Sequence, residues 1–280
     1  MRHLIKRNIS RRENSMRDPH VESLRYRLKT SATTTYENPR AVKFIRDEFE
    51  YNLNDGILTC HMREHYPAVR EARRVVDDFL HSWEIMAALE LEGGEMQFQF
   101  EDAHVIDRNP PPPGSSEFVH VSGSSGVKFT GSAISELCIT RRKYPDPPTN
   151  FAVTPDVEIL WQRYEKYLDG KKYLDGNKDL LSMAYACLTF VERKADGKRK
   201  AAAELYRIDY EILDKLGDLT STKGDAKTAR KFPKKGDLIP LSEKENKWIE
   251  AVIKILIRRT GELANIQSAQ TITMTDLPKI

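Results

Sequence analysis

The chain has 280 residues, of which 39% are hydrophobic and 31% charged, and its formal net charge is +3. This composition is typical of a soluble protein with enough apolar material for one large core or two ordinary ones. No apolar run approaches the ~20 residues that cross a bilayer, and the basic first residues lack the apolar region of a secretory signal, so we expect no membrane partner.

The cysteines are few and widely spaced. Cys60, Cys138 and Cys187 are an odd number and lie far apart in the sequence. Reduced thiols fit this pattern better than a disulfide framework does, so it indicates a cytoplasmic protein.

The charge is unevenly distributed along the chain. Residues 1–17 carry six Lys or Arg and one Glu, whereas residues 46–107 carry 15 Asp or Glu against five Arg. An acidic surface repels phosphate, so a nucleic-acid contact is expected only in the basic tail or in the C-terminal half.

The first half of the chain indicates an α+β domain of antiparallel strands with one packed helix. Alternating residues predict a strand at Val21–Leu28, and a second short strand, Ile57–Met62, follows the turn Asn54-Asp55-Gly56. A 3–4 spacing of apolar residues from Pro67 to Gly93 predicts the helix. Further strands are predicted at 96–100, 118–121, 127–129 and 134–140.

The second half indicates an α-helical bundle. Helices are predicted at 156–168, 180–191, 200–206 and 210–216, and a last helix opens with a capping box of Ser242 and Glu245. The repeated Lys-Tyr-Leu-Asp-Gly of residues 166–176 is interpreted as a loop. Residues expected to be buried across both halves are Phe79, Trp83, Trp161, Tyr185, Leu188, Trp248 and Val252.

The two halves meet at a proline-rich joint. Pro145, Pro147 and Pro148 restrict helix and strand pairing, so an extended linker is expected there. The predicted organisation is a flexible basic tail at 1–20, an α+β domain at 21–143, a linker at 144–154, a helical bundle at 155–264 and a flexible tail at 265–280.

The segment His61-Met-Arg-Glu-His65 matches the H-x-x-E-H pattern of some zinc peptidases. That chemistry needs both histidines on one helical face, whereas here the motif leaves a strand and meets Pro67. Metal binding by His61 and His65, serving a hydrolase, is therefore kept only as an alternative. Cys60 alternates with Leu58 as a core position of the strand, and Cys187 is expected inside a helix.

The predicted helices at 200–206 and 210–216 are similar to a helix-turn-helix, with Leu205 packed between them. A nucleic-acid contact would use Lys198, Arg199, Lys200, Lys227, Arg230 and Lys231. The acidic residues of the second helix disfavour a DNA groove, so packing helices beside a solvated loop remain the other interpretation.

Most of residues 20–264 resembles a family of uncharacterised bacterial proteins. The resemblance lies in Trp161-Gln-Arg-Tyr-Glu-Lys-Tyr-Leu, Leu181-Ser-Met-Ala-Tyr-Ala-Cys-Leu-Thr, Lys215-Leu-Gly-Asp-Leu-Thr-Ser and the last helix up to Arg259. The helical half also resembles the HEPN bundles of bacterial defence systems, whose ribonucleases use an Arg followed four to six residues later by a His. No histidine occurs after His120, so the resemblance implies a non-catalytic version, and we expect no imidazole chemistry in the helical half.

These observations favour a non-enzymatic protein-binding or regulatory protein of the bacterial cytoplasm, which acts on another protein through its helical half. A link to defence stays open. We expect no catalytic residue and no cofactor. A nucleic-acid-binding protein using the tail and residues 193–235 is the first alternative, the hydrolase is the second, and a homo-oligomer stays open.

Overall fold

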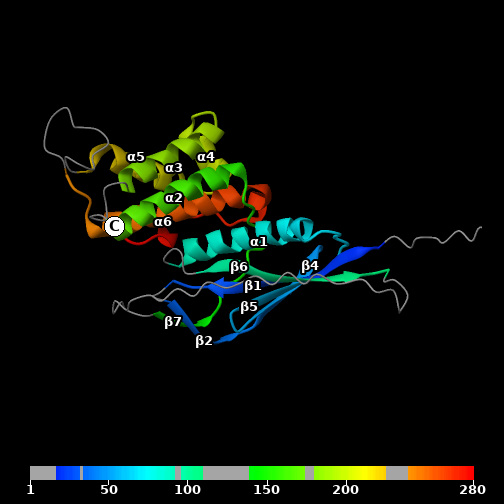
Figure 1. Ribbon diagram of the computed structural model, residues 1–280. Helices are drawn as coiled ribbons and strands as arrows, with labels where there is room; N and C mark the ends of the chain where they lie inside the picture. The colour runs from blue at the N-terminus through cyan, green and yellow to red at the C-terminus, as the bar shows by residue number, and fades with distance from the viewer. Residues whose placement is uncertain (1–16, 32–33, 92–95, 110–138, 174–179, 225–238) are drawn as a thin grey trace, which may run out of the picture. The chain divides into compact units, whose positions relative to one another are not determined.

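The computed structural model describes residues 17–31, 34–91, 96–109, 139–173, 180–224 and 239–280. It contains an antiparallel sheet with one long helix and a helical bundle, so the predicted α+β class is confirmed (Figure 1). The predicted strands at 118–121 and 127–129, and residues 134–138 of the third, lie outside the described residues.

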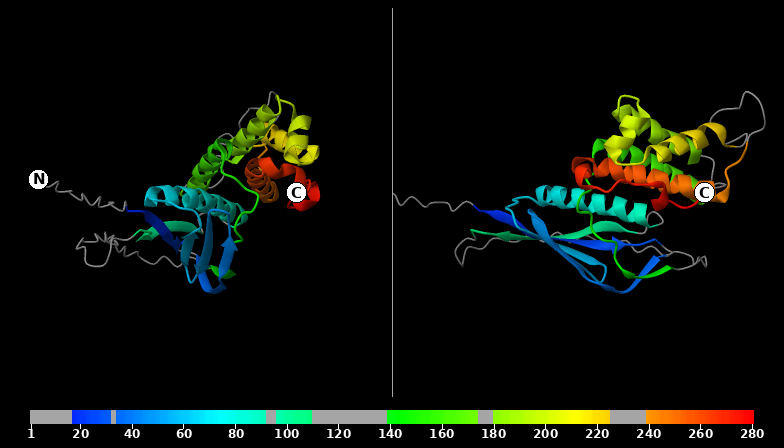
Figure 2. Two further views of the ribbon diagram at one scale, coloured as in Figure 1. Left: turned by 90° about the vertical axis from the view of Figure 1, so that its right-hand side faces the viewer. Right: turned by 180° about the vertical axis from the view of Figure 1, so that it is seen from behind.

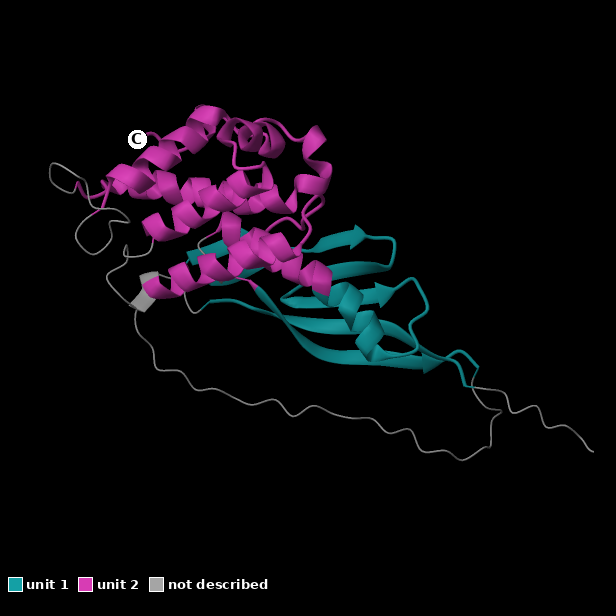
Figure 3. Cartoon of the chain, turned by 90° about the horizontal axis from the view of Figure 1, so that it is seen from above, with its two compact units in different colours: residues 1–77, 97–144 teal, residues 78–96, 145–280 magenta. Residues whose placement is uncertain are grey.

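The chain forms two compact units. Unit 1 comprises residues 1–77 and 97–144, and unit 2 comprises residues 78–96 and 145–280 (Figure 3). The helix α1 (Val69–Glu90) therefore belongs to both, because the division falls between Asp77 and Asp78. Residues 145–154 contain no helix or strand, as the prolines predicted.

Unit 1 is built on a five-stranded antiparallel sheet whose order is β3-β4-β5-β1-β6 (Figure 1). Its strands are β1 (Pro19–Lys29), β3 (Val42–Ile45), β4 (Phe49–Asn54), β5 (Ile57–Met62) and β6 (Gln97–Asp107). The strands predicted at 21–28, 57–62 and 96–100 correspond to β1, β5 and β6, and β5 has the predicted bounds. Asp55 and Gly56 take positive φ angles of 50° and 72°, the left-handed geometry that joins β4 to β5 by a tight turn.

Several strands were not predicted correctly. β4 and the short β3 were missed, and β6 extends seven residues beyond 100 because it pairs with β1 along its length through two register shifts. β2 (Thr34–Arg40) and β7 (Ile139–Lys143) form a separate two-stranded sheet, and they pair in parallel rather than antiparallel. β2 contains Asn38 and Pro39, which weaken the local strand signal.

The core of unit 1 lies on one face of its sheet. Alternate residues of β1, β4 and β5 are buried there, including Leu24, Tyr51 and Cys60. The first half of α1 is joined to this sheet by Tyr26, whose hydroxyl donates to Asp77 Oδ1 at 2.6 Å. Arg73 bonds the same carboxylate and its guanidinium lies 4.2 Å from the centre of the Phe100 ring.

Unit 2 is the helical bundle (Figure 2). Besides the second half of α1 it contains α2 (Pro155–Tyr173), α3 (Leu180–Lys194), α4 (Arg199–Tyr206), α5 (Tyr210–Thr222) and α6 (Glu243–Gly261), with two short 3-10 turns, η1 (Leu263–Ser268) and η2 (Met274–Asp276). α3 contacts α2, α4, α5 and α6, and α6 also contacts α2, α4 and α5. The capping box is confirmed, since Ser242 Oγ accepts from Glu245 N.

The buried residues of unit 2 match most of the expectations. Phe79, Trp83, Trp161, Leu188, Trp248 and Val252 are buried, whereas Tyr185 is only half-buried. The first Lys-Tyr-Leu-Asp-Gly repeat continues α2 as helix and is not a loop.

The prediction of a loose segment from residue 265 onward is wrong, because this segment packs on the bundle. Ile266 and Leu277 are buried. Ile272 exchanges backbone hydrogen bonds with the α4–α5 turn, accepting from Asp209 N at 2.8 Å and donating to Arg207 O at 2.9 Å. The apolar residues of this segment are spread too thinly for a helical pattern, so the sequence alone did not indicate their burial.

Candidate functional site

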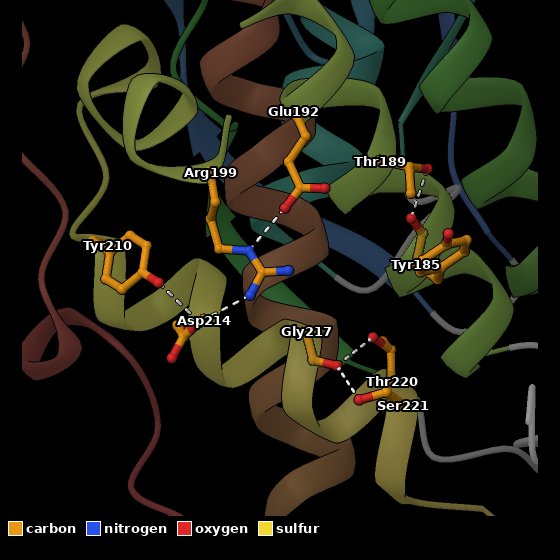
Figure 4. Close-up of polar contacts among 9 residues, drawn as sticks. All are labelled: Tyr185, Thr189, Glu192, Arg199, Tyr210, Asp214, Gly217, Thr220 and Ser221. Atoms are coloured by element: carbon orange, nitrogen blue, oxygen red, sulfur yellow. Dashed lines mark hydrogen bonds and ion pairs between the residues drawn. The ribbon is translucent and has the colours of Figure 1, made fainter. Parts of the chain in front are cut away.

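Arg199, the first residue of α4, is bonded to side chains of two other helices of the bundle. Its Nε donates to Glu192 Oε1 of α3 at 2.8 Å, and its Nη1 donates to Asp214 Oδ1 of α5 at 2.9 Å (Figure 4). One guanidinium therefore holds three helices in a fixed arrangement, which suits the rigid fork of donors that arginine carries.

The arrangement of α4 and α5 around Arg199 depends on the backbone at Arg207 and Gly217. Arg207 has φ 52° and ψ 51°, a left-handed conformation that ends α4 and lets α5 begin three residues later. Gly217 lies inside α5, where a Cβ atom would stand only 2.7–2.9 Å from the Arg199 guanidinium. A glycine inside a helix is unfavourable by itself, so the close approach of Arg199 is its structural reason.

The charges around Arg199 stabilise one another. Partial burial acts to lower the pKa of Arg199, but Glu192 and Asp214 outweigh it and the pKa is raised. Tyr210 donates its hydroxyl to Asp214 Oδ1 at 3.2 Å, and this hydrogen bond raises the pKa of Tyr210 (Figure 4). The Arg199 guanidinium therefore stays charged near neutral pH.

The hydroxyl groups beside this network bond backbone carbonyls. Thr189 Oγ1 donates to Tyr185 O at 2.9 Å, and Thr220 and Ser221 both donate to Gly217 O (Figure 4). A hydroxyl nucleophile needs a base within hydrogen-bond reach. These three hydroxyls instead bond the carbonyls of their own helices.

Two apolar side chains lie exposed at the turn where α4 ends and α5 begins. Leu205 is 37% exposed and Tyr210 is 40% exposed. The ammonium of Lys200 lies 5.9 Å from the centre of the Tyr210 ring. We call Lys200, Leu205 and Tyr210 the α4–α5 corner. The prediction that Leu205 packs between the two helices is wrong, since Leu205 is exposed, whereas Ala202, Ile212 and Leu213 are buried as expected for that helix pair.

The charge of this region is balanced. Residues 198–222 carry five basic and five acidic side chains. Of the residues predicted to bind nucleic acid, Lys198 and Lys200 are exposed, while Arg199 is engaged by two carboxylates. Lys227, Arg230 and Lys231 lie outside the described residues. The described part of the predicted basic region, residues 193–224, carries eight basic and six acidic side chains, against 13 and seven in the whole segment 193–235.

The structure separates the two histidines of the H-x-x-E-H segment. His61 lies on β5, while His65 follows the strand, and its Nε2 is 3.2 Å from Asp18 Oδ1. His65 also stacks on the buried His20, with ring centres 5.4 Å apart. Within the described ranges, no group of three or more His, Cys, Asp or Glu residues is arranged to hold a metal ion.

The described thiols are core residues. Cys60 and Cys187 are completely buried, as predicted. Burial raises the pKa of Cys187 to about 12 and that of Cys60 well above its ordinary value. A thiol in such a site is a poor nucleophile, because the thiolate is the reactive form.

One ionisable group of the bundle was missed. His81 is part of α1 but lies in unit 2, where its Nε2 contacts Glu158 of α2 at 3.0 Å. The segment after the linker contains no histidine, as expected, but unit 2 also includes residues 78–96 and therefore contains His81. The helical spacing of residues 69–90 predicted the helix but not which unit its second half joins.

Comparison with known proteins assigns neither a family nor a function to this chain. The chain matches no protein-family model, and neither the search of curated proteins nor that of solved structures finds a match for it. In the part of the chain that the structure describes, no helix is both long and apolar enough to span a bilayer.

Proposed function

We propose that this chain is a non-enzymatic binding protein whose helical unit binds another protein through the α4–α5 corner. One observation carries the proposal: Leu205, near the end of α4, and Tyr210, at the start of α5, are both exposed. The two helices that carry them are joined through the hydrogen bonds of Arg199. Tyrosine is enriched at protein interfaces because it combines a large apolar ring with a polar tip.

The charge balance supports a protein partner over a nucleic acid. A phosphate backbone is bound by an excess of Lys and Arg, whereas residues 198–222 carry equal numbers of basic and acidic side chains. α4 and α5 also carry exposed acids, namely Glu204, Glu211 and Asp218. A mixed-charge rim around apolar contacts is the usual composition of a protein interface.

The rigidity of the corner supports the same proposal. Binding costs free energy for every side chain or loop that it must order. Here Arg199 already joins α3, α4 and α5, and the C-terminal segment bonds the backbone at Arg207 and Asp209. The turn that carries Leu205 and Tyr210 is therefore ordered before a partner arrives.

The test compares two variants of the full chain. The corner variant replaces Leu205 and Tyr210 by Lys, and the control replaces Ile159, an α2 residue that is 48% exposed, by Lys. Proteins that the wild type retains from cell extract are purified and their affinities are then measured directly. We expect the corner variant to lose at least about tenfold in affinity, which corresponds to about 1.4 kcal/mol, while the control binds like the wild type.

Two results would overturn the proposal. One is a purified partner that binds both variants as well as it binds the wild type, with unchanged circular dichroism. The other is retention of RNA or DNA in place of a protein, falling steeply with salt and abolished by Lys198→Glu with Lys200→Glu, which would establish nucleic-acid binding instead.

A further inference from the structure

The strand β3 forms one end of the five-stranded sheet, and its only ladder partner among the described strands is β4. It is also the strand with the most exposed apolar side chains of unit 1: Phe44 is 47% exposed and Ile45 is 63% exposed. An exposed apolar edge strand is a template for pairing with a strand of another chain.

The hydrogen-bond pattern shows which backbone groups of β3 face outward. Arg46 N donates to Phe49 O at 2.9 Å, so Arg46 and Phe49 form a hydrogen-bonded pair of the antiparallel ladder. Such pairs alternate along a ladder. The register pairs Phe44 with Tyr51, two residues on, so Phe44 also bonds to β4. The N–H and C=O groups of Lys43 and Ile45 therefore point away from β4.

The charges around β3 are arranged with opposite signs at its two ends. Arg40 precedes the strand and Lys43 lies in it, whereas Arg46, Asp47 and Glu48 follow it, so that the first end is basic and the second carries one net negative charge. When two copies of such a segment pair antiparallel, the basic end of each lies beside the acidic end of the other. Opposite charges across a strand pair stabilise it, while like charges oppose it.

We propose that β3 pairs antiparallel with β3 of a second copy of this chain, which joins the two five-stranded sheets into one continuous sheet across a two-fold axis. Lys43 of each copy exchanges backbone hydrogen bonds with Ile45 of the other. This register sets the two Phe44 side chains opposite each other on one face, beside Tyr51, whose ring centre is 6.2 Å from that of Phe44. A two-fold interface of this kind is self-complementary and closes at the dimer.

We assign a second copy of this chain as the partner of β3 because the charges around β3 complement those of an identical strand in antiparallel orientation. A partner strand that was uniformly acidic or basic would meet like charges at one end of β3. The other end of the sheet, β6, presents one exposed apolar residue, Val105, and the charged Glu101 and Asp102. This inference concerns unit 1 and does not depend on the α4–α5 corner.

The most specific test of this pairing is the variant Ile45→Pro. Proline removes the N–H of Ile45, which points away from β4, so the ladder within the chain is kept while the bond to the second copy is lost. The matched control is Val105→Pro on β6, the opposite edge strand, and circular dichroism with thermal unfolding confirms that each variant is folded.

Sedimentation equilibrium of the full chain measures the outcome. We expect a dimer for the wild type and for the control, and a dissociation constant raised by about tenfold or more for Ile45→Pro, a loss of about 1.4 kcal/mol. Lys43→Glu should also weaken the dimer, and Lys43→Glu combined with Asp47→Lys should restore it. A wild type that stays monomeric at all concentrations, or a dimer that folded Ile45→Pro leaves unchanged, would overturn the inference.

Discussion

His81 Nε2 lies 3.0 Å from Glu158 Oε2, and this contact joins the second half of α1 to α2 inside the helical unit. Glu84 places a second carboxylate 3.9 Å from the other ring nitrogen, too far for a hydrogen bond but close enough for an ion pair. Glu84 and Glu158 raise the pKa of His81 from 6.5 to about 9, while burial acts in the opposite direction. The imidazole is therefore charged near neutral pH and acts as a cation between two acids.

The first prediction is that the His81 ion pair makes stability depend on pH. Because the folded pKa is raised, the stabilisation is fully present below pH 6.5 and is lost as the pH rises through about 9. The difference in unfolding temperature between the wild type and His81→Gln should therefore be largest near pH 6 and shrink toward pH 10. Glu158 has a lowered pKa, mainly through its hydrogen bond with His81. The stabilisation that Glu158 contributes is therefore lost when the pH falls far enough to protonate it.

Glu158→Gln tests whether the pair is responsible. In that background, His81→Gln should change the unfolding temperature by less than it does in the wild type, over the same pH range. A difference between wild type and His81→Gln that stays constant from pH 6 to about 10 would contradict the assignment of the pKa shift to this cluster.

The second prediction concerns Gly217 and Arg199. Replacing a glycine inside a helix by alanine normally stabilises by about 0.5–1 kcal/mol. In the wild type the new Cβ would displace the Arg199 guanidinium, so Gly217→Ala should bring no gain or a loss. In an Arg199→Ala background the same change should stabilise by the full amount, as measured by denaturant unfolding.

Gly170 supplies the control for this cycle. It lies in α2, and a Cβ built there meets nothing within 4 Å. Gly170→Ala should therefore give the same change in unfolding free energy with Arg199 present or absent. Equal effects of Gly217→Ala in the two backgrounds would show that Arg199 does not constrain Gly217.

The third prediction concerns the core of the bundle. Trp248 is fully buried and Leu188 nearly so. Truncation of either to Ala should cost on the order of 2–5 kcal/mol of unfolding free energy, because the cavity is only partly filled by relaxation. Ile159→Ala, at an exposed position, should stay within about 0.5 kcal/mol of the wild type. An unchanged melting temperature for both core variants would mean that the helix faces are misassigned.

The fourth prediction concerns the buried thiols. Alkylation with iodoacetamide at pH 8, mapped by mass spectrometry, should leave Cys60 and Cys187 unmodified in the native protein and modify both after denaturation. The physical reasons are their complete burial and the raised pKa of each thiol. Modification of either in the native state, as fast as that of a free thiol, would contradict this.

The sequence predicted the elements whose signals are local. Ile57–Met62 alternates, residues 69–90 repeat at 3–4 spacing, and the capping box of Ser242 and Glu245 lies within one helical turn, so each pattern is complete within its own segment. The weak strands β3 and β4 were missed because pairing with their neighbours, and not their own composition, stabilises them: β3 pairs with β4, and β4 pairs with β5.

The candidate site was only partly predictable. The sequence identified the two helices and the basic residues near them, and it singled out Arg199 as a charge for a nucleic acid. It could not show that Glu192 and Asp214, seven residues before Arg199 and 15 after it, would meet that guanidinium. Leu205 was assigned to the core because helical spacing predicts which side chains share the apolar face of a helix. It does not predict how much of that face neighbouring helices bury.

By itself, then, the sequence determined the fold class, the absence of helix and strand at the proline joint, the capping of α6 and the burial of Cys60 and Cys187, since hydrophobic period, proline geometry and capping act over a few residues. Only the tertiary structure decided that His81 joins the helical unit, that Arg199 is occupied by carboxylates, and that residues 263–277 pack on the bundle. These features depend on which distant residues meet, and that is set by the packing of whole elements against one another.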